Sequence, residues 1–224
     1  HPDCFPTVEV YAQAFIDFVA GILPGGALLA CGDDAGAAEL LQVARERGIW
    51  ALAYGIDAQG LAYRAENLVP HPAGGYAFDI AFSQPQRSPL RLAARLLVPG
   101  RHNVLNALAA LAVADQLGLP LAQAGAALSE FRGTGRRFEL RGEAGGVTVI
   151  DDYAHHPTKI RATLAAARMR YPGRRIWAVW QPHTYSRTRR LLAEFAQAFA
   201  QADRVVGTEI YAAREQAPAA GCAR

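Results

Sequence analysis

Apolar residues along the first part of the chain follow helical and strand periods in turn. Residues 7–22 place apolar side chains every three or four positions, which is typical of one face of a helix. Short apolar runs follow at 27–31 and 49–54, and a second helical pattern lies between them at 35–47. This order predicts an α/β arrangement.

Between residues 61 and 98, short apolar segments are separated by Pro, Gly and Ser, which predicts a small antiparallel portion. Two Ala-rich helical patterns then continue to Phe131. Gly133 and Gly135 interrupt the helical period, and the charge balance changes sign at the same place. We therefore place a domain boundary after residue 132.

The remainder alternates regularly between strand and helix patterns. Strands are predicted at 147–151, 175–180 and 204–208, and helices between them at 157–170 and 188–200. This alternation is typical of a parallel, Rossmann-like sheet. The predicted fold class is α/β throughout.

Composition favours a globular protein of the cytoplasm. Of the 224 residues, 51% are hydrophobic, so a sizeable core can form. No apolar run approaches the roughly 20 residues that cross a bilayer, and no signal-peptide pattern is present. The scattered cysteines, Cys4, Cys31 and Cys222, are predicted to be reduced, buried thiols.

The net charge of +3 hides a strong segregation. Residues 1–131 sum to −5, whereas residues 132–190 carry 12 Arg and Lys159 against four acids, a sum of +9. Arginine suits bidentate binding of phosphate or carboxylate, so the basic segment favours an anionic ligand. A solvated arginine-rich face is the alternative.

Polar clusters follow each of the three strands predicted after residue 146. They are "DDYAHH" at 151–156, "QPHTYSR" at 181–187, and Glu209 with Tyr211. Ligands bind beyond the carboxyl ends of parallel strands, so we expect the clusters to face one crevice. For the first cluster, helix capping ahead of Pro157 is the alternative.

Two chemistries could use these clusters. In a metal-dependent hydrolase, His155, His156 and His183 would hold a divalent ion together with the aspartates, although adjacent histidines point in different directions. In an anion site, Arg187 and His183 would bind a carboxylate while Asp152 accepts hydrogen bonds from a sugar hydroxyl.

Five segments resemble, in order and spacing, the Mur ligases of bacterial cell-wall synthesis. They are "GRHNVLNALAALAVA" at 100–114, "FRGTGRRFE" at 131–139, "DDYAHHPT" at 151–158, "QPHTYSRTR" at 181–189 and "EIYAARE" at 209–215. The resemblance implies the latter part of a central ATP-binding domain over residues 1–132. A Rossmann-like, amino-acid-binding C-terminal domain would follow over 133–224.

The resemblance also implies an ATP- and magnesium-dependent amide ligase of peptidoglycan precursor synthesis. The family member that it most resembles joins L-alanine to UDP-N-acetylmuramate through an acyl phosphate. A related muropeptide ligase and a non-catalytic nucleotide-binding module remain alternatives. We expect neither a nucleic-acid partner nor membrane insertion.

For ATP, the resemblance implies contacts at five positions. His102, Asn103 and Asn106 would meet the adenine or nearby groups, with helix capping as the alternative. Arg137 would approach the phosphates and Asp152 the ribose, with a surface ion pair as the alternative.

For the amino acid, the resemblance implies that His155, His183 and Arg187 are the catalytic and substrate-binding residues, which hold alanine and its carboxylate. Tyr153 would line the same crevice. His1, in "HPD", matches a magnesium ligand of the family, with a disordered terminus as the alternative.

The chain departs from the family pattern in one large respect. Family members begin with a UDP-sugar-binding domain and a phosphate loop that ends in Gly-Lys-Thr. The only lysine in the sequence, Lys159, follows Thr158 and so cannot belong to a Gly-Lys-Thr loop. It stands where relatives often have Glu. We therefore expect a fragment that lacks both features and is inactive by itself.

Overall fold

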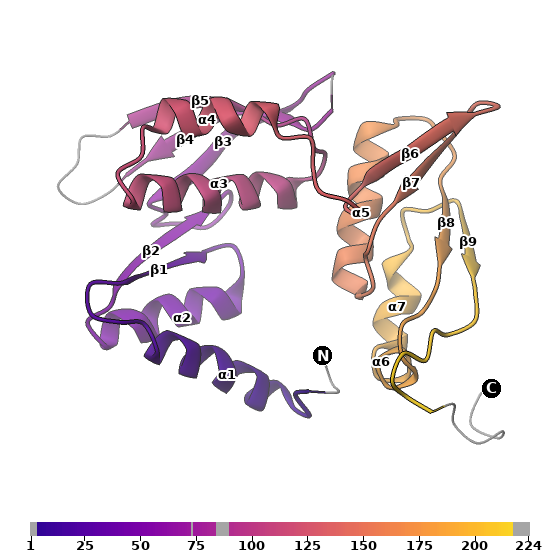
Figure 1. Cartoon of the computed structure of the whole chain (residues 1–224), viewed down its shortest axis with the longest axis horizontal. Helices are drawn as coiled ribbons and strands as arrows, with labels where there is room; N and C mark the ends of the chain where they lie inside the picture. The colour runs from indigo at the N-terminus through magenta and orange to yellow at the C-terminus, as the bar shows by residue number, and fades with distance from the viewer. Residues whose placement is uncertain (1–3, 73, 84–89, 217–224) are drawn as a thin grey trace. The chain divides into compact units, whose positions relative to one another are not determined.

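The computed structural model describes residues 4–72, 74–83 and 90–216 (Figure 1). The chain divides into two compact units, Val8–Gly133 and Thr134–Arg224, and the second also includes His1–Thr7. His1, the predicted magnesium ligand, and Cys222 lie outside the described residues.

The unit Val8–Gly133 is built on a mixed five-stranded sheet. β1, β2 and β3 are parallel neighbours, and β3, β4 and β5 are antiparallel neighbours. The predicted α/β start and antiparallel portion are therefore both confirmed. The strands are β1 (Ala27–Cys31), β2 (Trp50–Gly55), β3 (Tyr63–Pro70), β4 (Tyr76–Phe82) and β5 (Leu90–Arg95).

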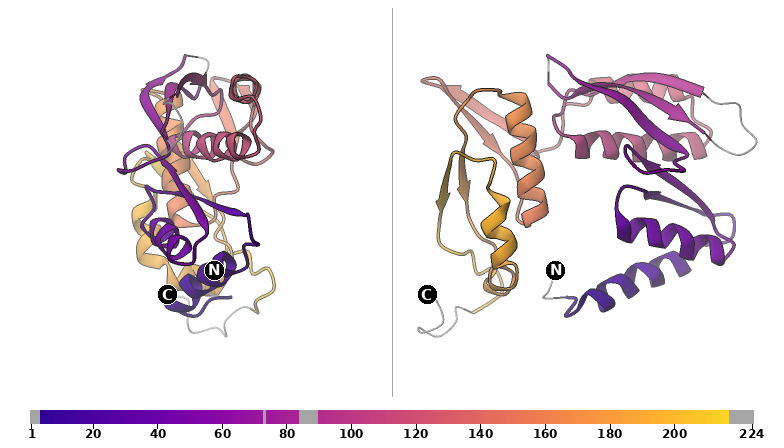
Figure 2. Two further views of the ribbon diagram at one scale, coloured as in Figure 1. Left: turned by 90° about the vertical axis from the view of Figure 1, so that its left-hand side faces the viewer. Right: turned by 180° about the vertical axis from the view of Figure 1, so that it is seen from behind.

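Helices cover both faces of this sheet because alternate residues of a strand point to opposite sides. In β2, Leu52 belongs to the core formed with α3, whereas Ala51 and Ala53 belong to the core formed with α2. α1 packs on α2, and α4 lies beside α3 over β5, as Figures 1 and 2 show. The helices are α1 (Val8–Ala20), α2 (Ala35–Glu46), α3 (Arg101–Gln116) and α4 (Leu121–Glu130).

Tyr63 makes two hydrogen bonds in the larger core. The hydroxyl of fully buried Tyr63 donates a hydrogen bond to Asp115 Oδ2 at 2.9 Å and accepts one from Gln116 Nε2 at 2.8 Å. Buried polar groups need such partners. These two hydrogen bonds join β3 to the end of α3.

The unit that begins at Thr134 contains two separate strand pairs. β6 (Glu139–Ala144) and β7 (Val147–Asp151) form an antiparallel hairpin, and β8 (Trp177–Trp180) pairs with β9 (Arg204–Gly207) in parallel. The three predicted strands exist, but β7 pairs with β6 and not with β8. The predicted parallel pairing is thus confirmed for β8 and β9, whereas β7 pairs with β6 because Gly145 and Gly146, at φ 55° and 75°, turn the chain back on itself.

Helices pack against β8 in this unit. The predicted helix 157–170 is confirmed as α5 (Pro157–Arg170). The single helix predicted at 188–200 is instead two, α6 (Tyr185–Arg190) and α7 (Leu192–Ala198), which Leu191 separates. The ring of Trp180 contacts those of Phe195 and Phe199, with centroid distances of 4.7 and 5.2 Å.

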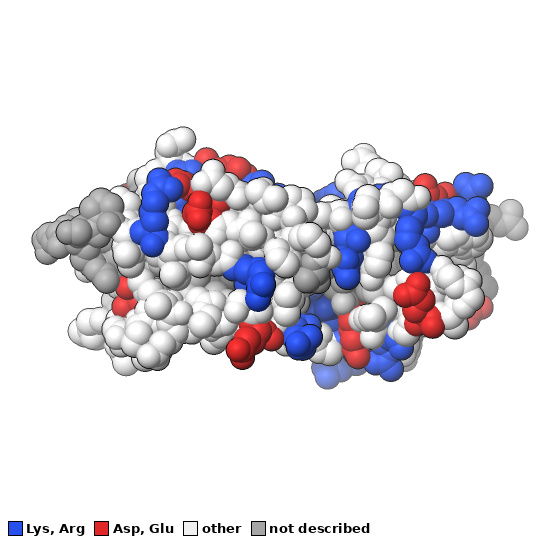
Figure 3. Space-filling model, turned by 90° about the horizontal axis from the view of Figure 1, so that it is seen from above, with Lys and Arg blue, Asp and Glu red and all other residues white. Residues whose placement is uncertain are grey.

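Surface features follow the charge segregation of the sequence. On the face shown in Figure 3, most Lys and Arg side chains lie over the part of the chain that holds β6 and β7, with acidic side chains among them.

Cys31 is a partly buried free thiol, but Cys4 is exposed, which contradicts the expected burial. Among the described helices, none is long and apolar enough to cross a membrane.

Candidate functional site

Four aromatic rings form a row at the strand ends of the Thr134–Arg224 unit. The ring of Tyr153 lies 4.8 Å from His155, His155 lies 6.0 Å from His183, and His183 lies 5.5 Å from Tyr211, measured between centroids. The rings come from the segments after β7, β8 and β9. The three predicted clusters therefore lie side by side.

Arg187 joins this row from the first turns of α6. Its side chain is buried, with 4% of the residue exposed, and Nη1 lies 3.2 Å from Nδ1 of His183. A guanidinium can only donate, so Nδ1 of His183 accepts. A neutral His183 then carries its proton on Nε2.

His155 has the opposite tautomer. Its Nδ1 lies 2.8 Å from the carbonyl oxygen of Tyr153 and donates to it, since a carbonyl can only accept. Burial lowers the pKa of His155 below its ordinary value, and the charges of Lys159 and Arg187 lower it further against the opposing bond to Tyr153. His155 is therefore neutral at pH 7.

His156 has a structural contact. Its Nδ1 accepts from the backbone N–H of Thr158 at 3.4 Å, and the residue is the N-cap of α5. Burial and then neighbouring positive charges, among them Lys159 and Arg187, lower its pKa. The helix-capping interpretation therefore holds for His156, while His155 turns towards His183.

Cationic groups surround this row. Burial lowers the pKa of the Lys159 ammonium, and Arg137 and Arg187 lower it further, whereas Asp152 opposes them. The guanidinium carbons of Arg136 and Arg137 lie 4.8 and 5.8 Å from the ring centroid of Tyr153. Such a concentration of positive charge suits an anionic ligand.

Asp152 is partly engaged by the protein. Its Oδ2 accepts a hydrogen bond from the backbone N–H of Phe138 at 2.9 Å. A surface ion pair was the alternative for Arg137 and Asp152, but the ion pair found here joins their neighbours: Arg136 Nε lies 3.8 Å from Asp151 Oδ2. One carboxylate oxygen of Asp152 thus fixes the start of β6, and the other can serve a ligand because a carboxylate has about four acceptor sites.

The three candidates His102, Asn103 and Asn106 lie in the first two turns of α3. Asn103 Nδ2 donates to the carbonyl oxygen of Pro99 at 2.7 Å, and Asn106 Nδ2 donates to Asn103 Oδ1 at 3.2 Å. His102 and Asn106 are exposed. Side-chain hydrogen bonds of Asn103 and Asn106 thus stabilise the start of α3, and the contact of these three residues with a nucleotide stays a prediction.

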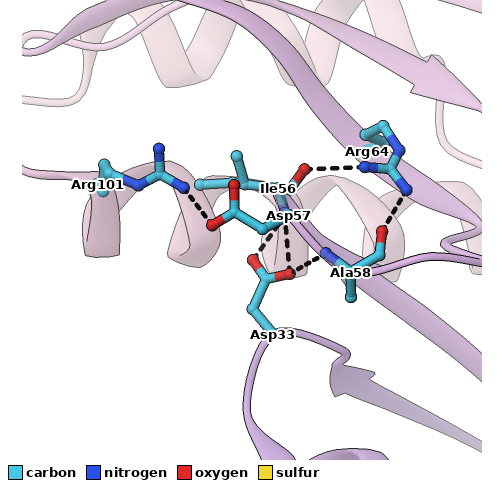
Figure 4. A network of polar contacts seen from close by, with 6 residues as sticks. All are labelled: Asp33, Ile56, Asp57, Ala58, Arg64 and Arg101. Carbon is cyan, nitrogen blue, oxygen red and sulfur yellow. Dashed lines mark hydrogen bonds and ion pairs between the residues drawn. The ribbon is translucent and has the colours of Figure 1, made fainter.

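A network around Asp33 holds the loop after β2 (Figure 4). The Asp33 carboxylate accepts from the backbone N–H groups of Ile56, Asp57 and Ala58 at 2.7, 3.0 and 2.8 Å. Burial alone would raise its pKa, but these N–H groups and the charge of Arg101 outweigh burial and lower it.

The same network reaches the start of α3. Arg64 donates to the carbonyl oxygens of Ile56 and Ala58, and Arg101 pairs with Asp57 at 2.6 Å (Figure 4). Arg101 directly precedes His102. The loop and the helix start are thus tied together, which the sequence pattern did not predict.

Sequence reasoning also missed Glu215, whose carboxylate accepts hydrogen bonds from the backbone N–H of Ser186, at 2.9 Å, and from its hydroxyl. Only its place inside "EIYAARE", directly after the third cluster, pointed to it. Among the described residues, no group of three His, Cys, Asp or Glu side chains could hold a metal ion.

Comparisons with known proteins agree with this arrangement. Residues 1–114 match the Mur ligase middle domain, and residues 136–223 match the Mur ligase, glutamate ligase domain. A UDP-N-acetylmuramate–L-alanine ligase of Chloroflexus aggregans is 46% identical over 96% of this chain and 47% of its own length. The chain thus spans about half the length of the curated relatives that it matches.

Solved structures give the same result. The crystal structure of a UDP-N-acetylmuramate–alanine ligase from Thermotoga maritima aligns with a TM-score of 0.66 and 30% identity, over 92% of this chain and 42% of that one. A murein peptide ligase from Psychrobacter arcticus aligns with a TM-score of 0.60 and 28% identity, over 88% and 40%. The predicted fold class, a central Mur-ligase domain followed by a C-terminal one, is therefore confirmed.

Proposed function

The chain belongs to the Mur ligase family, and we propose that it is part of an ATP-dependent ligase that joins L-alanine to UDP-N-acetylmuramate. One observation carries this proposal: His155, His183 and Arg187, from segments far apart in the sequence, meet in one cationic cluster. ATP and a UDP-sugar as substrates agree with the cytoplasmic location expected from composition.

In this proposal, Arg187 binds the carboxylate of alanine. Its guanidinium is always charged and presents paired donors, and burial keeps water from competing for them. His183, whose Nδ1 accepts from Arg187, holds that guanidinium in place. Tyr153 lines the same cluster through its ring contact with His155.

His155 would contact the amino group of alanine. An ammonium cannot attack a carbonyl, so the amino group has to lose a proton first. The Nδ1–H bond to Tyr153 puts the lone pair of the neutral ring on Nε2, from which it can accept an amine hydrogen. The lowered pKa of His155 keeps it in that neutral form at pH 7.

ATP supplies the phosphoryl group that activates the carboxylate of the sugar. We propose that His102, Asn103 and Asn106 contact its base, and that Arg137 and Asp152 contact a phosphate and the ribose. Magnesium usually keeps several waters and binds substrate phosphates with one or two protein ligands, so its binding needs no protein cage. His1 stays the predicted protein ligand.

The test uses the protein expressed from the complete open reading frame that encodes this chain. We expect phosphate release that requires ATP, UDP-N-acetylmuramate and L-alanine together. A peptide that begins with L-alanine, offered in place of alanine, separates this activity from that of a murein peptide ligase. Absence of alanine-dependent release would refute the proposal. The same assay on the 224 residues alone tests their expected inactivity.

Arg187→Ala tests the central residue. Loss of hydrogen bonds to a charged group should raise the KM for alanine by about 10- to 100-fold and leave the KM for ATP nearly unchanged. Arg189→Ala, which removes an exposed arginine from the same helix, is the matched control. An unchanged alanine KM in the Arg187 variant would remove this residue from the amino-acid site.

A further inference from the structure

The segment Tyr211–Glu215, called here the strap, lies against the segment that carries His183. Tyr211 N donates to the carbonyl oxygen of Pro182 at 2.8 Å, and Thr184 N donates to the carbonyl oxygen of Tyr211 at 2.9 Å. His183 and Tyr211 thereby form a parallel bridge. The backbone on both sides of His183 is fixed by the strap.

The far end of the strap holds the start of α6. One oxygen of Glu215 accepts from the backbone N–H of Ser186 at 2.9 Å, and the other accepts from its hydroxyl. Ser186 directly precedes Arg187. A single carboxylate thus fixes the turn from which the buried guanidinium projects.

Thr184 lies between Pro182 and Ser186, which the strap also holds, and its backbone conformation is unfavourable. Its φ is 64°, which a β-branched residue rarely adopts, and only 8% of the residue is exposed. Its buried hydroxyl has no hydrogen-bond partner in the described part of the chain. Such costly conformations persist only where the surroundings enforce them, and they concentrate at functional sites.

We propose that Glu215, acting through the strap, is a positioning residue that sets His183 and Arg187 for the carboxylate of the amino acid. The inference rests on the proposed function. Glu215 does not itself touch the ligand: it fixes Ser186, while the backbone of Tyr211 fixes Pro182 and Thr184. Without it, α6 could start in another conformation, and Arg187 would lose its alignment with His183.

The test compares Glu215→Gln with Ser186→Ala in the protein expressed from the complete open reading frame. Gln keeps one acceptor oxygen for the backbone N–H of Ser186, but it loses the hydroxyl contact and the charge that strengthens the remaining bond, so we expect the KM for alanine to rise about tenfold. Ser186→Ala loses only the hydroxyl contact and leaves the charge-assisted bond to the backbone N–H, so the KM for alanine should rise about threefold. The KM for ATP should stay within about twofold in both variants.

Two controls separate positioning from general damage. Glu194→Gln removes an exposed carboxylate from the first turn of α7 and should behave as wild type. The double variant of Glu215 and Ser186 should be no worse than Glu215→Gln alone, because the hydroxyl contact that Ser186→Ala removes is already lost in Glu215→Gln. A second readout is the imidazole proton resonance of His183, which should shift when the ring of Tyr211 is no longer held 5.5 Å away.

The outcomes distinguish the two proposals. A wild-type protein without alanine-dependent phosphate release overturns the proposed function. An active wild type with unchanged alanine KM in both variants overturns the role of Glu215, as does an equal rise in the KM for alanine and for ATP. If Glu215→Gln does not fold, Ser186→Ala still decides.

Discussion

Asp33→Ala should destabilise the Val8–Gly133 unit by about 2 kcal/mol. The carboxylate accepts three backbone hydrogen bonds, at 2.7, 3.0 and 2.8 Å, from residues 56–58. Each is exposed, so water can replace part of it, and each loss should cost about 0.5–1 kcal/mol, at the lower end of the usual range. Asp57→Ala is the matched control, because it removes only an exposed ion pair with Arg101 and should cost less than about 1 kcal/mol.

The assay has to report on this unit alone, because a chain with two units need not unfold in one step. Trp50 lies in β2, whereas Trp177 and Trp180 lie in β8. Fluorine NMR of protein labelled with 5-fluorotryptophan therefore follows the two units separately during urea unfolding. Hydrogen exchange of the amides at 56–58 should also accelerate in the Asp33 variant.

The pH dependence gives a second check. The pKa of Asp33 is lowered from its ordinary value of 3.8 in the folded state. Its stabilisation is thus present above that value and is lost as the pH falls through the folded pKa. The difference between wild type and Asp33→Ala should shrink there. A cost at pH 7 no larger than that of Asp57→Ala would refute the reasoning.

Three further changes have expected outcomes. Burial lowers the pKa of His156 in the folded state, so its contribution to stability is present above pH 6.5 and is lost as the pH falls through the folded pKa. His156→Asn should therefore flatten the fall in thermal stability on acidification. Gly75→Ala puts a Cβ 2.2 Å from a backbone oxygen at φ 66° and should cost more than about 3 kcal/mol in urea unfolding, whereas Gly60→Ala, at φ 68° in open space, should cost about 1 kcal/mol. Tyr63→Phe removes the donor to Asp115 and should cost about 1–3 kcal/mol by calorimetry.

The elements of the fold could be predicted because each buries one face, and the period of apolar residues shows that face. Strand pairing is less visible in the sequence. Gly145-Gly146 between two short runs is a hairpin signal, yet Glu139–Ala144 is largely polar and exposed, so period alone did not reveal β6. The break at Leu191 likewise has no Gly or Pro to mark it.

The candidate site shows the same division. His155, His183 and Arg187 could be chosen because costly polar groups follow strands, and the structure brings them together. Asp33 and Glu215 could not be chosen in this way. Their partners lie 23 to 29 residues away, and only the tertiary fold brings a carboxylate to those backbone N–H groups.

The charge state of the cluster bears on which form of an amino acid it can use. Burial lowers the pKa of His155, and the fields of the cations Lys159 and Arg187 lower it further. The same fields disfavour an ammonium and favour a neutral amine beside them, whereas they attract a carboxylate. A zwitterion held by its carboxylate would therefore lose its ammonium proton more readily here than in water. In the proposed ligase, the residues that bind alanine thus also favour its nucleophilic form.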